Sequence, residues 1–198
     1  NARKRVQRFL HAGKAEEIIF TRNTTEALNL VAYSYGVSHL RPGDEILVSI
    51  MEHHSNLLPW QMVAARTGAV LKFLECSPDG RLTQERIRGA FTPRTRLAAV
   101  TQVSNVFGRV NPIREITRIA HEQGAVVVVD AAQSAPHIPI DVCGLDVDFL
   151  AFSGHKLLAP MGIGVLYGKE ELLQAMPPFL TGGEMIERVR SEEHTSEL

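Results

Sequence analysis

The run Val126-Val127-Val128-Val129 constrains the fold of this chain more than any other segment. Valine is β-branched and favours strands, and an unbroken apolar run suits a strand that is covered on both faces. Strands of that kind are typical of parallel sheets with helices on both sides. A carboxylate, Asp130, follows the run directly. The segment therefore predicts the central strand of an α/β domain, with a polar residue at its carboxyl end.

Strand-like and helix-like segments alternate along most of the chain, with short turns between them. We expect strands at residues 18–20, 45–50, 69–74, 97–101, 125–129 and 149–152. We expect helices at residues 24–31, 57–65, 83–91 and 113–122, the first of them with hydroxyls at its cap. This alternation predicts an α/β fold with a mostly parallel sheet covered by helices.

Composition narrows the class of protein. A chain of 198 residues, 44% of them apolar, can bury the core of one α/β domain. A net charge of −1 gives no general reason to expect nucleic acid or an anionic membrane as a partner. No apolar stretch approaches the roughly 20 residues that span a bilayer. Two cysteines are too few for a disulfide framework, which favours the cytoplasm. Because the first residue is asparagine, we expect the chain to begin inside a larger protein.

Polar residues follow several of the predicted strands, at the edge of the sheet where α/β proteins bind ligands. In chain order they are Asn23, Thr24 and Thr25; Glu52, His53 and His54; Gln102, Ser104 and Asn105; Asp130 and Gln133; and Ser153, His155 and Lys156. Because the ends of parallel strands share one edge, we expect a single site there.

Two of these groups allow more than one interpretation. Thr24 and Thr25 are either ordinary helix caps or, with the free backbone N–H groups beside them, a phosphate site. His53 and His54 are a solvated pair, a metal site or an aromatic lid. Metal is the weakest of these alternatives, because adjacent histidines lack the spacing of a known ligand set.

The remaining groups favour pyridoxal phosphate. Alone, Asp130 is explained as a helix cap, Gln133 as a surface residue and Lys156 as a solvated lysine. Together, a lysine after Ser-x-His can form an imine with the cofactor aldehyde, and an aspartate at a strand end can keep the ring nitrogen protonated.

Five segments in this order resemble cysteine desulfurases of the SufS/CsdA type, in the class V aminotransferase group of fold type I pyridoxal phosphate enzymes. They are Arg22-Asn23-Thr24-Thr25-Glu26-Ala27, Met51-Glu52-His53-His54-Ser55-Asn56, Val103-Ser104-Asn105, Asp130-Ala131-Ala132-Gln133 and Ser153-Gly154-His155-Lys156-Leu157. The double histidine with Trp60 nearby is most similar to the SufS/CsdA group, whereas Ala159 stands where a glycine is common. The resemblance implies the three-layer large domain of that fold, truncated at both ends.

The resemblance also implies residue roles. Lys156 would hold the cofactor and move protons at the substrate Cα, and His53 would stack on the ring and act with Lys156 in catalysis by relaying protons. Asp130 would pair with the ring nitrogen, Gln133 with the phenolic oxygen, and Asn105 would lie near that oxygen and the substrate carboxylate. The phosphate would be held by Thr24, Thr25, Ser153 and His155. No metal is implied.

The implied reaction converts L-cysteine to L-alanine and passes sulfur to an enzyme cysteine, then to an acceptor protein of the SufE or SufU kind for iron–sulfur cluster assembly. A homodimer is implied. Neither Cys76 nor Cys143 matches the family's nucleophile, so we expect structural roles for both, and we expect this chain alone not to complete turnover. The alternatives are another class V enzyme (lyase, racemase or aminotransferase) and a module that keeps the fold without the chemistry.

The resemblance divides the chain in two. Residues 1–189 correspond to a partial cofactor-binding large domain. Residues 190–198 are polar and do not continue the family pattern, and we expect them to be a translated sequencing adapter. An intact genomic reading frame encoding the same residues would contradict that expectation.

Overall fold

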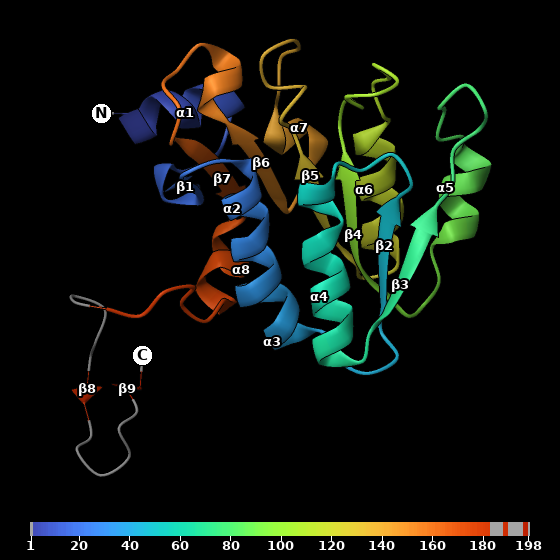
Figure 1. The fold of residues 1–198 in the computed structure, drawn as a ribbon, viewed down its shortest axis with the longest axis horizontal. Helices are drawn as coiled ribbons and strands as arrows, with labels where there is room; N and C mark the ends of the chain where they lie inside the picture. The colour runs from blue at the N-terminus through green and yellow to red at the C-terminus, as the bar shows by residue number, and fades with distance from the viewer. Residues whose placement is uncertain (1, 183–187, 190–195, 198) are drawn as a thin grey trace.

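The computed structural model describes residues 2–182, 188–189 and 196–197. Within them, a seven-stranded sheet lies between two layers of helices (Figure 1). The strands in chain order are β1 (Ile18–Thr21), β2 (Glu45–Ser49), β3 (Val70–Leu74), β4 (Thr95–Thr101), β5 (Val126–Asp130), β6 (Phe149–Ser153) and β7 (Gly164–Gly168). A separate antiparallel pair joins β8 (Arg188–Val189) to β9 (Ser196–Glu197). Most of the tail from residue 190 onward lies outside the described residues.

The order of strands in the main sheet is β1-β7-β6-β5-β4-β2-β3. The run from β3 to β6 is parallel, and β7 is antiparallel to both of its neighbours, so β1 points the same way as β6. The predicted mostly parallel sheet is confirmed. Strand β7 was not predicted, because its sequence begins and ends in glycine; all five of its residues are buried between β1 and β6.

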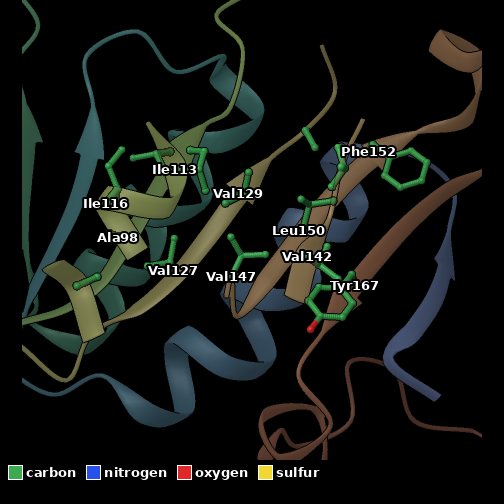
Figure 2. Close-up of a cluster of buried hydrophobic side chains, with 14 of the residues drawn as sticks. Ala98, Ile113, Ile116, Val127, Val129, Val142, Val147, Leu150, Phe152 and Tyr167 are labelled. Carbon is green, nitrogen blue, oxygen red and sulfur yellow. The ribbon is translucent and has the colours of Figure 1, made fainter. Parts of the chain in front are cut away.

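Alternate residues of β5 pack on opposite faces of the sheet, as the valine run predicts. Val127 and Val129 join the core that is shown in Figure 2, whereas Val128 joins the core on the other face. The helices packed on the face of Val127 and Val129 are α1 (Ala2–Leu10), α5 (Gln84–Ala90), α6 (Ile113–Glu122) and α7 (Val142–Leu145). Helix α1 was not predicted, because Leu10 is its only buried residue and its apolar signal is weak.

The second layer contains α2 (Thr24–Leu30), α4 (Leu58–Thr67) and α8 (Glu170–Ala175), of which α2 and α4 lie in front of the sheet in Figure 1. Helix α2 continues through a π-helical segment (Val31–Gly36) into α3 (Val37–His39). Trp60, on α4, is fully buried in this layer. The four predicted helices are present, with ends shifted by a few residues. No helix in the described part of the chain has both the length and the apolar character needed to cross a membrane.

Candidate functional site

A cavity of about 350 Å³ opens at the carboxyl ends of β1, β4, β5 and β6. All nine residues that the sequence singles out for cofactor binding or catalysis line it, namely Thr24, Thr25, His53, Asn105, Asp130, Gln133, Ser153, His155 and Lys156. The other lining residues are Asn23, Ser55, Thr101, Val103 and Ala132. The polar residues that follow the strands therefore meet at a single cavity, as the sequence predicts.

The loop between β1 and α2 forms one wall of the cavity. The cap of α2 differs from the prediction: Asn23, not a threonine, caps the helix, with its Oδ1 accepting from the Glu26 N–H at 2.8 Å. Thr24 instead bonds to β6, because its N–H donates to Ser153 Oγ at 2.8 Å and the two hydroxyls lie 2.6 Å apart. Thr24 and Ser153 are 5% and 4% exposed, so this tie is shielded from water. Thr25 remains exposed at the cavity.

Gly164 allows this wall to sit directly on the sheet. A Cβ at that position would lie 2.6 Å from the Cα of Asn23, far inside van der Waals contact. The β1–α2 loop can therefore rest on β7 only because residue 164 has no side chain.

His53 and the short 3₁₀ helix His54–Asn56 form the facing wall. The imidazole Nδ1 of His53 accepts the Ser55 N–H at 3.1 Å and lies 3.0 Å from Ser55 Oγ. The Ser55 hydroxyl also lies 2.8 Å from that of Thr25, which joins the two walls. His54 turns away and lines a separate hollow with Tyr33 and Met62.

Asp130, the last residue of β5, is the buried charge of the cavity and is 4% exposed. Burial raises the pKa of this carboxyl above its ordinary value. The Ala132 N–H, bonded to Oδ1 at 2.8 Å, and the charges of Lys156 and His53 lower this pKa and so oppose the effect of burial. A further cationic donor in the cavity would therefore be favoured beside Asp130.

Lys156 lies on a short 3₁₀ helix, Gly154–Leu157, that follows β6 directly. The chain returns sharply towards β7 here, since the Gly154 N–H donates to the Ile163 carbonyl at 2.8 Å. A Cβ on Gly154 would meet the Ile163 side chain at 2.7 Å, so glycine is required for this close return. The result places an exposed amine at the cavity, near the buried carboxylate of Asp130.

Some polar residues at the strand ends do not line the cavity. Gln102 faces a groove along α6, and Ser104 is buried, where its hydroxyl accepts the N–H groups of Val106 and Phe107. The Glu52 carboxyl accepts hydrogen bonds from the Asn56 side chain and from the Thr101 N–H. Ser55 and Thr101 also line the cavity, although the sequence predicts no role for either; Ser55 lies within the double-histidine segment, and Thr101 ends a predicted strand.

The two cysteines are free and lie outside the cavity lining. Cys76 is partly buried against the core, as expected of a structural cysteine. Cys143 differs from the expected buried residue: it is exposed, and its thiol lies 3.1 Å from the His11 carbonyl. Within the described residues, no three His, Cys, Asp or Glu side chains converge as metal ligands.

Comparison with known proteins gives consistent matches. Residues 1–197 match the family model described as aminotransferase class-V. A cysteine desulfurase of Escherichia coli is 53% identical over 99% of this chain and 48% of its own length, and a probable cysteine desulfurase of Synechocystis is 54% identical over 98% of this chain and 46% of its own. The chain thus spans about half the length of the curated relatives it matches.

Solved structures share the fold. The cysteine desulfurase CsdA from Escherichia coli has a TM-score of 0.93 and 47% identity, over 99% of this chain and 49% of that chain. A cysteine desulfurase from Thermococcus onnurineus has a TM-score of 0.90 and 44% identity, over 99% of this chain and 48% of that chain. A mutant of the cystine C-S lyase C-DES, with glycine covalently linked to its pyridoxal phosphate cofactor, has a TM-score of 0.85 and 28% identity, over 98% of this chain and 51% of that chain.

Proposed function

Because the chain belongs to the class V aminotransferase family, we propose that its cavity binds pyridoxal phosphate as part of a cysteine desulfurase. The observation that carries the proposal is the presence of the exposed Lys156 amine and the buried Asp130 carboxyl in one cavity of about 350 Å³. That volume lies within the range of small-molecule sites. Relatives at 53–54% identity are named cysteine desulfurase or probable cysteine desulfurase.

The residues of the cavity fit this cofactor. When bound, pyridoxal phosphate supplies an electron sink for the carbanion at the substrate Cα. Lys156 would hold the cofactor aldehyde covalently and then carry a proton to or from that Cα. Asp130 would keep a proton on the ring nitrogen, and His53 would cover the ring. The exposed groups of Thr25 and His155 would bind the phosphate, together with the buried pair Thr24 and Ser153.

The polar residues that follow β4 and β5 would orient the remaining groups. Gln133 would donate to the phenolic oxygen of the cofactor, and Asn105 would lie near that oxygen and the substrate carboxylate. In the reaction, the bond from Cβ to sulfur of L-cysteine breaks, sulfur passes to a cysteine thiolate as a persulfide, and L-alanine leaves. Because Cys76 and Cys143 do not line the cavity, the accepting cysteine would come from outside residues 1–198.

Two sequence features bear on the kind of desulfurase to which the chain belongs. The double histidine and Trp60 support membership in the SufS/CsdA group. We propose a cytoplasmic homodimer that passes sulfur to an acceptor of the SufE or SufU kind for iron–sulfur cluster assembly. Size measurement of the full-length protein and sulfur transfer to each purified acceptor would test these parts.

Cofactor uptake tests the proposal on the chain itself. Titration with pyridoxal phosphate should give a new visible absorption band that Lys156→Ala abolishes. Lys14→Ala is the matched control, because Lys14 pairs with Glu170 at the surface and is not part of the cavity lining. A folded chain that binds no cofactor, or a band unaffected by Lys156→Ala, would contradict the proposal.

A further inference from the structure

Glu52, the residue before His53, is held from three directions. Its Oε1 accepts the Thr101 N–H of β4 at 2.8 Å and also pairs with the Ser49 hydroxyl at the end of β2. Its Oε2 accepts an N–H of the Asn56 side chain at 2.7 Å. This carboxylate therefore joins the ends of two neighbouring strands to the loop that carries His53.

Trp60 fixes the orientation of Asn56. The indole N–H donates to Asn56 Oδ1 at 3.0 Å, and both residues are fully buried. Because an indole N–H is a donor only, the Asn56 amide must direct its oxygen to Trp60 and its NH₂ to Glu52. Residue 52 must therefore present an acceptor to Asn56, and a second acceptor to the Thr101 N–H.

His53 lies inside this network. Its carbonyl accepts the Asn56 N–H at 2.8 Å, while its ring accepts the Ser55 N–H at 3.1 Å. Both residues that flank the loop, Glu52 and Asn56, are thus bonded to the buried core and to each other. We propose that Glu52 is a positioning residue, which fixes His53 and through it the cofactor ring by accepting hydrogen bonds from Asn56 and Thr101. The inference rests on the proposed cofactor site.

The charge state of Glu52 does not undo this arrangement. Burial and the nearby Asp130 carboxylate raise the pKa of Glu52 to about 8, against the three donors, which lower it. When Glu52 is protonated, its O–H can donate a hydrogen bond to the Ser49 hydroxyl, since a serine oxygen can both donate and accept. The acceptors for Asn56 and Thr101 are kept in both states.

Glu52→Gln tests the requirement for two acceptors. Either orientation of the new amide places its NH₂ against an N–H of Asn56 or of Thr101. We expect pyridoxal phosphate to bind about tenfold more weakly, as expected when a buried donor loses its partner. The emission of Trp60, the single tryptophan, should shift. Glu75→Gln is the matched control: it makes the same change at the exposed Glu75, directly after β3, and should alter neither measurement.

A second substitution should reverse the defect. The double variant combines Glu52→Gln with Asn56→Asp. Its carboxylate at position 56 can accept hydrogen bonds from the Trp60 indole N–H and from the amide NH₂ at position 52. The oxygen of that amide can still accept the Thr101 N–H. The number of carboxyl groups is unchanged. We expect this double variant to regain most of the lost affinity for pyridoxal phosphate. A double variant that binds no better than Glu52→Gln would overturn the hydrogen-bond argument.

Two further measurements separate positioning of the ring from general damage to the fold. The dissociation constant of inorganic phosphate, obtained from competition after allowing for the changed cofactor affinity, should be unaffected by Glu52→Gln, because the network does not include Thr24, Thr25, Ser153 or His155. In a His53→Ala background, Glu52→Gln should cause no additional loss of cofactor affinity. If the unmodified chain takes up no cofactor, both the cofactor site and the role of Glu52 are wrong. If it binds cofactor and Glu52→Gln binds equally well, the role of Glu52 alone is wrong.

Discussion

Gly164→Ala should displace the wall of the cavity that carries Thr24 and Thr25. The added Cβ would lie 2.6 Å from the Cα and carbonyl carbon of Asn23, and 2.8 Å from its nitrogen. Carbon atoms pack at roughly 3.5–4.0 Å, so the loop must move by about 1 Å. These contacts are to backbone, and no side-chain rotation relieves them.

The size of the effect follows from that overlap. Overpacking of this kind costs about 1–3 kcal/mol, which corresponds to a fall of roughly 2–12 °C in Tm for a domain of this size. Gly164 also pairs with Thr21 of β1 and Ser153 of β6, so the displaced backbone lies at the cavity. We therefore expect the Kd for pyridoxal phosphate to rise together with the loss of stability.

Differential scanning calorimetry and cofactor titration measure both effects. Gly89→Ala is the control, because a Cβ on that residue of α5 meets nothing within 4 Å and alanine favours the helix. Its Tm should stay the same or rise. The reasoning is refuted if Gly164→Ala retains both the Tm and the cofactor affinity of the unmodified chain.

Three other predictions concern the same region. Ser153→Ala leaves the buried Thr24 N–H without its acceptor, so chemical denaturation should show a loss of about 1–3 kcal/mol, and an unchanged midpoint would count against the tie. Folding raises the pKa of Glu52 to about 8, so the stabilising contribution of Glu52 is complete below about pH 4.5 and is lost as pH rises through about 8. Over that range the free energy of unfolding should fall by up to about 5 kcal/mol. Glu52→Gln should make the free energy of unfolding less dependent on pH. Asp130→Asn removes a buried charge, so the Tm without cofactor should not fall while the Kd for pyridoxal phosphate rises at least about tenfold; equal affinity would contradict the role of Asp130.

The sequence predicts which side chains gather at one cavity, because strand ends in a parallel sheet share one edge. The valine run identifies β5, and the position of Asp130 at its end is a direct consequence. Lys156 and His53 follow other strands of the same direction, so they reach the same cavity although they are far apart in the chain. This part of the prediction needs only periodicity and the rules of α/β topology.

Other features depend on packing that no local pattern encodes. Strand β7 is an antiparallel strand that begins and ends in glycine, and Gly164 is explained only by the approach of Asn23 from a distant part of the chain. Glu52 also follows a strand, but the direction in which its side chain points depends on Asn56 and Trp60, which lie further along the chain. A strand end thus predicts the edge of the sheet, and the surrounding hydrogen bonds decide where each side chain points.

Covalent labelling tests the central claim most directly. The chain is incubated with pyridoxal phosphate, treated with borohydride, digested and mapped by mass spectrometry. The cofactor site predicts that the reduced adduct is found on Lys156, and that its yield falls strongly in Asp130→Asn. An adduct spread over surface lysines such as Lys14 and Lys72, or one that forms equally well in Asp130→Asn, would contradict the assignment of this cavity.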